Sequence, residues 1–344
     1  MSPAVGPWAS RLYFSDPPRL ALRGRALGPS WRFQHSVHGT VTVLSDPAMA
    51  AEALAAGLHI AGAERLIPWL GPSSPLTVPL GRRPYLEEAV VTVAGWSARV
   101  AAGFPRAFIE RALRPARNAR ADVGAGLRWA VRAWLVEELV GRSSPALAAT
   151  LPWEAAAATA PLLVPTLRPL YPRFAGLDEA RLRMLAALAE GELGPALDGR
   201  AGSYIVGCVM ALLGPLADAL PMLAMNAIAL QDPSPARRIT RTLALHPPVP
   251  IVLLQARRPV ELRRARLQLG EGGVVGLDLG GAGLPFGAGW LADAARSIAV
   301  RFLQQTLQVV SELDLHAPRS PVRGRVRLCW GPVSLQVAKW AATP

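Results

Sequence analysis

The stretch that most constrains the fold is residues 204–230, which are almost entirely apolar. This run is long enough to span a lipid bilayer, and Asp218 is its only charged side chain. Pro215 and Pro221 lie in its interior, however, and the chain has no second run of this kind. A helix that is apolar on all sides can also form the centre of a large helical core. We therefore expect a buried core helix here and no membrane span.

The composition is that of a folded chain with an excess of positive charge. Of its 344 residues, 51% are hydrophobic and 18% are charged, which is enough for a sizeable core and argues against disorder. The net charge of +13 rests on arginine, because Lys339 is the only lysine. A GC-rich genome explains this bias, although a basic surface also attracts anionic partners. No aromatic residues interleave the arginine clusters as in nucleic-acid motifs, so we expect no nucleic-acid partner.

Cysteines and histidines give no sign of a disulfide framework or a metal site. Cys208 and Cys329 are too few for a framework, and we expect both to be ordinary buried residues. His35 and His38 lie close together, but no third ligand is evident, so we expect no metal. The first residues lack the charged start and apolar core of a signal peptide, which favours the cytoplasm.

Local signals at the beginning of the chain predict a strand and a helix. Residues 1–35 are rich in Pro, Gly and Arg and look irregular. Alternation over 39–44 predicts a strand. In the helix that follows, Asp46 suits the N-cap, Pro47 the first position and Gly57 the end.

The rest of the chain predicts a mainly α fold with small β elements and one domain over 1–344. Helical composition runs from about 119 to 230, with breaks at 141–145, 167–174 and 197–203, and another helix is predicted over 234–245. Short strands are predicted at 260–262, 273–279, 325–330 and 333–338.

Residues 284–303 form a glycine-rich turn followed by an amphipathic helix. One side of this helix is mostly apolar and consists of Ala295, Ile298, Ala299, Phe302, Thr306, Val309 and Leu313. Such a face is typical of a helix that packs on a core. The turn before it has the glycines of a loop that holds a ligand.

The order of these parts resembles a cytochrome P-450. TVTVLSDPAMAAEAL at 40–54 is similar to the first strand and helix of that family, and TLALHPPVP at 242–250 to the segment after its conserved-motif helix. RRPVEL at 257–262, LPFGAG at 284–289 and GPVSLQVA at 331–338 follow in the family's order, the second as the start of the heme loop. The resemblance covers most of the chain, most strongly after residue 240, and implies a cytochrome P-450-like single domain that is shortened before the heme loop.

The heme loop departs from the family at the residue that binds iron. The family's loop reads Phe-Gly-x-Gly-x-x-x-Cys-x-Gly, and the cysteine thiolate is the axial ligand. Phe286, Gly287 and Gly289 match, but the cysteine position is Asp293 and the final glycine is Ala295. A small shift of the alignment does not restore the ligand, because no cysteine lies near the loop. A carboxylate is a poor substitute for the thiolate.

Three further features of heme monooxygenation are missing. The family's glutamate and arginine before HPP fall on Arg241 and Ala244, and its propionate-binding arginine falls near Leu254 and Gln255. The oxygen-activating motif of the central helix falls on five residues that we expect to line a pocket: Leu213, Gly214, Pro215, Leu216 and Ala217. In addition to these three losses, about thirty residues that usually precede the heme loop are reduced to GGAG. Together with the lost cysteine, these changes predict that no heme is bound.

Two carboxylates are candidates for catalysis. Asp218 is a candidate proton donor if it is buried, and the alternative is a solvent-facing position. Asp293 either faces the space of the heme as an acid or caps its helix. Gly214 and Pro215 kink the central helix, either beside a pocket or with no ligand.

Three functions are compatible with this sequence. The first is a heme-free auxiliary protein of natural-product biosynthesis, similar to homologues that activate macrolide-type glycosyltransferases or recruit enzymes to peptide synthetases. The second is a heme-independent enzyme that cyclises or isomerises an apolar isoprenoid, with or without a diphosphate, or a polyketide. The third is a heme protein with an unusual ligand. The first is favoured; a filled interior supports it, and an open, acid-bearing cavity supports the second.

Overall fold

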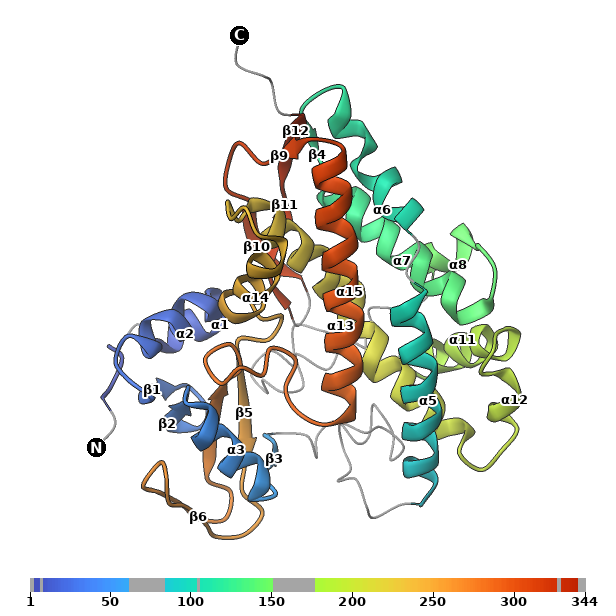
Figure 1. The fold of residues 1–344 in the computed structure, drawn as a ribbon. Helices are drawn as coiled ribbons and strands as arrows, with labels where there is room; N and C mark the ends of the chain where they lie inside the picture. Colours follow the sequence, from blue (N-terminus) through green and yellow to red (C-terminus); the bar gives the residue numbers. More distant parts are fainter. Residues whose placement is uncertain are drawn as a thin grey trace. The chain divides into compact units, whose positions relative to one another are not determined.

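A computed structural model confirms a mainly helical chain with small sheets. The structure describes residues 3–6, 9–61, 84–103, 106–150, 177–326 and 329–339. Its contacts divide the chain into two compact units, each built from two segments (Figure 1). Unit 1 comprises Met1–Ala63 and Arg241–Ala288, and unit 2 comprises Glu64–Thr240 and Gly289–Pro344. We describe the units separately, and the single domain over 1–344 stays a prediction.

The beginning of the chain is not irregular, contrary to the sequence prediction. Helix α1 (Ala9–Ser15), helix α2 (Pro17–Arg25) and strand β1 (Ser30–His35) occupy most of it. The Asp16 carboxylate caps α2 by accepting the backbone N–H of Arg19 at 3.2 Å. The prolines misled the prediction because they stand in the first turn of α2, where a missing N–H costs nothing.

The predicted strand at 39–44 and the helix after it are confirmed. They are β2 (Gly39–Leu44) and α3 (Pro47–Ala55). The Asp46 carboxylate accepts the backbone N–H groups two and three residues further on, both at 2.9 Å. Gly57 follows the helix with φ +71°, a conformation that favours glycine. Cap, proline and glycine thus act as the sequence indicates.

Unit 1 is built on a five-stranded sheet with the order β1-β2-β8-β5-β3. The other strands of this unit are β3 (His59–Ile60), β5 (Ile251–Gln255) and β8 (Val274–Asp278), with a separate hairpin of β6 (Val260–Leu262) and β7 (Leu267–Leu269). The β2–β8 pair is parallel and the other pairs in the sheet are antiparallel. Strands β6 and β8 were predicted, whereas β5 was not.

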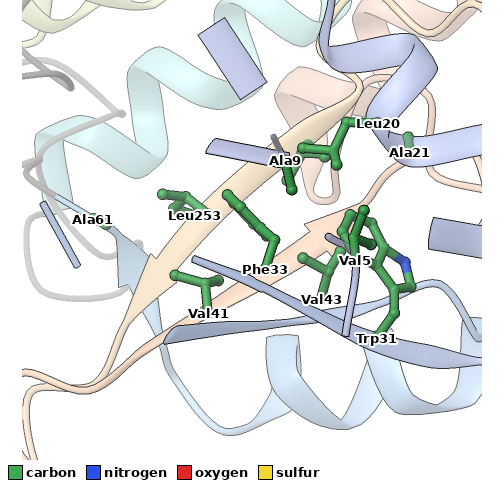
Figure 2. Packing of buried hydrophobic residues seen from close by; sticks show 11 residues of the cluster. Val5, Ala9, Leu20, Ala21, Trp31, Phe33, Val41, Val43, Ala61 and Leu253 are labelled. Carbon is green, nitrogen blue, oxygen red and sulfur yellow. The ribbon is translucent and has the colours of Figure 1, made fainter. Parts of the chain in front are cut away.

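A buried apolar cluster packs on each face of this sheet. The cluster beside α1 and α2 consists of Val5, Ala9, Leu20, Ala21, Trp31, Phe33, Val41, Val43, Ala61, Ile251 and Leu253. In Figure 2 the strand residues Phe33, Val43 and Leu253 lie below Ala9 and Leu20 of the helices. Neighbouring strand residues point to opposite faces, so Leu254 belongs to a second cluster, with residues of α3 and the β6–β7 hairpin.

Unit 2 is helical. Its helices are α5 (Pro84–Ala102), α6 (Arg106–Leu113), the 3-10 turn η2 (Arg114–Arg117), α7 (Gly124–Val140), α8 (Pro145–Thr150), α11 (Leu177–Glu190), α12 (Gly194–Leu197), α13 (Gly202–Ala229) and α15 (Trp290–Glu312). Helix α14 (Pro235–Leu245) runs across the division and confirms the helix predicted at 234–245. The predicted breaks at 141–145 and 197–203 are confirmed, and 167–174 lies outside the described residues.

Helix α13 is the core helix of unit 2 and packs against α15, α7 and α5 (Figure 1). Among the described helices it alone has the length and apolar composition of a membrane span, but 89% of its most apolar window is buried. Such a test is weak evidence for a span, because buried core helices also pass it. Pro215 and Pro221 each remove a helical hydrogen bond, and the surrounding packing offsets that cost.

The apolar face predicted for the helix after the glycine turn is confirmed in α15. Six of its seven residues are buried, and Leu313 is half-buried at the C-cap. This face contacts the other helices of unit 2, chiefly α13 and α5.

The strands predicted near the end of the chain have the wrong bounds. Unit 2 contains a hairpin of β10 (Val322–Val326) and β11 (Cys329–Ser334) and a sheet of β4 (Ala121–Asp122), β12 (Gln336–Lys339) and β9 (Leu315–His316). The predicted strand 325–330 joins the end of β10 to the start of β11, and 333–338 joins β11 to β12. Neither run has a glycine or proline where one strand ends, so the pattern gave no sign of the break.

Two glycines in helices test how closely α2 packs on the sheet. A Cβ on Gly24 of α2 would lie 2.0 Å from Cε2 of the buried Trp31, whereas a Cβ on Gly95 of α5 would meet nothing within 4 Å. We expect Gly24→Ala to lower the free energy of unfolding by about 2 kcal/mol through overpacking. We expect Gly95→Ala to raise it by about 0.5–1 kcal/mol, because alanine favours a helix. Urea unfolding followed by fluorescence measures both, and a neutral or stabilising Gly24→Ala would contradict this packing.

Candidate functional site

The glycine-rich turn at 284–289 keeps the backbone that its sequence predicts. Gly287 has φ +88° and donates its N–H to the carbonyl of Leu284 at 2.8 Å. Gly289 has φ +87° and is the N-cap of α15. Residues with a side chain rarely adopt these backbone angles, so the two glycines are needed for the shape of the turn. Phe286 is half-buried beside them.

Asp293, at the position of the family's cysteine, is exposed in the first turn of α15. Its backbone N–H donates to the carbonyl of Gly289 at 3.1 Å, and its own carbonyl accepts the Ser297 hydroxyl at 2.9 Å. The predicted cap is wrong, because the helix begins at Trp290 and no side chain caps it. The carboxylate instead lies near the positive end of the helix dipole, where a negative charge is stabilising.

The side chains at the family's heme positions do not fit a thiolate-bound heme. Cys208 is buried in α13, and desolvation raises the pKa of its thiol to about 12, which disfavours the thiolate. Cys329 belongs to β11, and its side chain is not among those described. At the propionate position Leu254 is buried, and the Gln255 amide donates to the carbonyl of Gly272 at 3.1 Å. Among the described side chains, Cys208 does not favour the thiolate that the iron would need, and Leu254 and Gln255 do not offer a propionate the arginine that the family uses.

The two neighbouring histidines of unit 1 serve the local backbone. His35 Nδ1 accepts the backbone N–H groups of Val37 and His38 at 3.1 and 3.3 Å, and the rings of His35 and His38 stack with centroids 5.0 Å apart. Burial and, to a smaller extent, the neighbouring His38 lower the pKa of His35 to about 4. In the described part of the chain no three metal-binding side chains come together. The expectation of no metal site therefore stays a prediction.

The five residues expected to line a pocket are largely covered by other protein atoms. Leu213, Leu216 and Ala217 are at most 1% exposed, and Gly214 is buried as well. Pro215 is half-buried. This part of α13 is thus filled in by its own protein surroundings. A role in lining a ligand pocket stays a prediction.

Asp218, the next residue of α13, is buried with 2% of its side chain exposed. The alternative that it faces solvent is therefore wrong. Its Oδ1 lies 3.6 Å from Nη2 of Arg132 on α7, whose side chain is 27% exposed. The sequence analysis missed Arg132, although an arginine between the apolar Val131 and Ala133 of a packed helix is a signal for such a partner.

A second buried carboxylate, in unit 1, belongs to Asp278 at the end of β8, which is fully buried. Arg25 of α2 donates to both of its oxygens, from Nε and Nη2, at 2.6 Å each. The Ser45 hydroxyl donates to Oδ2 at 2.9 Å and accepts the indole N–H of Trp31 at 2.9 Å. The backbone N–H of Gly281 donates to Oδ1 at 3.1 Å. Four hydrogen bonds thus satisfy one buried carboxylate.

This network also reaches the segment where the family's glutamate–arginine motif is lost. Arg25 Nη1 donates to the carbonyl of Ala244, at the position of the family's arginine, at 3.0 Å. The shortened GGAG connection packs directly on the pair. A Cβ on Gly280 would lie 2.2 Å from the Ala244 oxygen, and one on Gly281 would lie 2.6 Å from Asp278 Oδ2. Both glycines are therefore required by the close approach, and neither Arg25 nor Asp278 was singled out from the sequence.

The comparisons with known proteins give a fold and no close relative. No protein-family model and no curated protein sequence matches this chain. The crystal structure of CalO2 matches with a TM-score of 0.69 and 17% identity, covering 98% of this chain and 99% of that one. P-450BioI, in complex with an acyl carrier protein ligated to hexadec-9Z-enoic acid, matches at 0.68 and 13%, covering 94% and 99%. HmtN, a post-tailoring hydroxylase of himastatin biosynthesis, matches at 0.56 and 17%, covering 87% and 91%.

Removal of one partner tests the Arg25–Asp278 pair. Arg25→Met leaves the buried Asp278 carboxylate without its guanidinium, so we expect the free energy of unfolding to fall by about 3 kcal/mol. Arg19→Met, at an exposed position of the same helix, is the matched control and should change it by less than about 0.5 kcal/mol. Urea unfolding of both variants measures the difference. Equal effects of the two substitutions would refute a central role for the pair.

Proposed function

We propose that this chain, which has the cytochrome P-450 fold, is a heme-free homologue from natural-product biosynthesis that acts as an auxiliary protein for a partner enzyme, such as a glycosyltransferase. The observation that carries the proposal is that other protein atoms cover most of residues 213–217 of α13. In the family this segment handles oxygen beside the heme. Side chains that other protein atoms already cover are suited to a packed scaffold, and a scaffold acts by what it presents on its surface.

Two further observations support this function. The position of the axial ligand carries an exposed carboxylate, and the propionate position carries a buried leucine, so neither of these two described positions matches the heme chemistry of the fold. Among the matching structures, HmtN acts in himastatin biosynthesis and P-450BioI is bound to a carrier protein. Proteins of this fold thus occur in secondary metabolism and dock onto other proteins, and we extend both properties to this chain.

The burial of Asp218 favours a second candidate function. A buried acid can start proton-transfer chemistry, as a cyclase or isomerase of an isoprenoid or polyketide requires. Arg132 lies 3.6 Å from this carboxylate, however, and an ion pair of this kind also serves structure alone. The other candidate acid, Asp293, is exposed on α15. The auxiliary role therefore remains the first proposal.

The absence of heme is tested by the absorption spectrum of the purified protein. We expect no Soret band after expression with a heme precursor, and no change on adding dithionite and carbon monoxide, because no described side chain replaces the thiolate. Asp293→Cys restores the ligand position alone and is expected to remain without a stoichiometric band, because Leu254 and Gln255 do not replace the propionate partner. A near-stoichiometric Soret band in the wild-type protein would overturn the proposal.

The choice between helper and enzyme is tested with a candidate partner glycosyltransferase, to be sought among the genes that neighbour this one. The auxiliary role predicts that the two proteins elute as one complex in size-exclusion chromatography, and that this chain raises the turnover of the glycosyltransferase at least about tenfold, the effect of a modest coupling free energy. The enzyme alternative predicts turnover by this chain alone that Asp218→Asn abolishes. Turnover without the partner would replace the first proposal by the second.

A further inference from the structure

The β6–β7 hairpin of unit 1 concentrates positive charge on a small surface. Five exposed arginines occur within residues 257–266, namely Arg257, Arg258, Arg263, Arg264 and Arg266. Along the sequence only two acidic residues, Glu261 and Glu271, lie within or next to this segment, and Glu52 of α3 approaches it in space. Arg263, Arg264 and Arg266 stand together between the two strands, and we call these three residues the arginine tip.

The backbone of the arginine tip is fixed from outside. Glu52 of α3 accepts the backbone N–H of Arg263 at 2.9 Å with one carboxylate oxygen and that of Arg264 at 3.0 Å with the other. The N–H of Arg266 donates to the carbonyl of Arg263 at 3.1 Å. Because these bonds use main-chain atoms, the guanidinium groups are not needed to hold the tip. A tip ordered in advance loses less entropy when it binds a partner.

Arg266 occupies a strained position that glycine would fill at lower cost. Its φ is +49°, in the left-handed region, where a side chain approaches the following carbonyl oxygen too closely. In the described part of the chain one other non-glycine residue, Asp314, has a positive φ. Strained backbone positions persist where the surrounding structure holds them, and they cluster at binding and catalytic sites. At Arg266 the side chain contributes a third guanidinium to the tip.

The guanidinium groups of the tip are available to a partner. Arg263 Nε lies 3.6 Å from Glu261 Oε2, but both side chains are more than half exposed, so this pair is weak. Arg264 and Arg266 make no ion pair with any described residue. Arginine presents a planar fork of donors that matches a carboxylate in two parallel hydrogen bonds. The tip therefore offers the geometry that recognises Asp and Glu side chains.

We propose that the arginine tip, with Arg257 and Arg258 beside it, is the docking surface for an acidic face of a partner protein. This inference rests on the proposed auxiliary function and names the surface that would serve it. Residues 257–271 contain no aromatic side chain on which a base could stack, and the large exposed apolar residues of the described structure lie elsewhere. A lipid interface and single-stranded nucleic acid are thus less suited to the tip than a carboxylate-rich protein surface.

Binding of fluorescein-labelled poly-L-glutamate, followed by anisotropy, tests this surface on the full chain. The tip variant is Arg263→Gln with Arg264→Gln and Arg266→Gln. The matched control makes the same charge change at three exposed arginines of unit 2, Arg114, Arg117 and Arg120. At low salt we expect the tip variant to bind about tenfold more weakly than wild type, and the control less than about twofold, because three exposed charge pairs are lost only in the first.

Two outcomes of this experiment would overturn the inference. Equal losses in the tip variant and the control would mean that net charge alone governs binding. Tighter binding of duplex DNA, or of phosphatidylglycerol vesicles, that is lost in the tip variant would assign the tip to nucleic acid or membrane instead of protein. Neither outcome involves heme or the turnover of a partner, so the auxiliary function would stand or fall separately.

A single substitution separates the side chain of Arg266 from its strained backbone. Arg266→Gly should raise the melting temperature by about 2 °C, because glycine relieves the left-handed conformation. The same variant should weaken the binding of poly-L-glutamate, because one guanidinium is lost. Weaker binding together with a higher melting temperature supports a position kept for its side chain. Unchanged binding would show that Arg266 does not belong to the docking surface.

Discussion

The fold of unit 1 depends on the charge of one buried carboxylate. Asp278 is inaccessible to solvent, and burying its charge without a partner would cost about several kcal/mol of folding free energy. Arg25, Ser45 and the Gly281 amide together remove that cost, and each comes from a different part of the unit. The same guanidinium holds the carbonyl at the end of α14. Two helices, a strand end and the shortened connection are thus fixed by one group.

Local signals predicted the elements that local interactions decide. The helix after Asp46 was predictable because its cap, its first proline and its final glycine all act within a few residues, and the buried face of α15 follows from its period alone. Strand β5 carries no such signal, since its residues pair with β8 about twenty residues away and with β3 near the start of the chain. The bond between Arg25 and Asp278 joins positions 253 residues apart. A pattern within a short window of sequence cannot predict a contact between residues so far apart.

In the candidate site, too, features set by local interactions were predicted and features set by distant contacts were not. The glycines of the turn at 284–289 were predicted from their type, because only the backbone matters there. The environment of Asp218 was not, because a helix that is apolar on every side does not reveal which side receives Arg132. The prediction of a cap at Asp293 was wrong by about one helical turn, because α15 begins earlier and its N-cap is Gly289. Glycine has no side chain that would mark this position in the sequence. What the site does therefore depends on contacts that only the folded chain brings together.

The parallel pairing of β2 with β8 has a consequence for the synthesis of the chain. Strand β2 ends at Leu44 and β8 begins at Val274, so the edge of β2 is complete 230 residues before its partner exists. At typical translation rates this interval lasts about ten to fifty seconds. Throughout it the β1–β2 hairpin presents an unpaired edge and the apolar face of Val41 and Val43 to its surroundings. The sheet of unit 1 therefore cannot close until Val274–Asp278 has been synthesised, and the early hairpin is open to edge-to-edge aggregation during that interval.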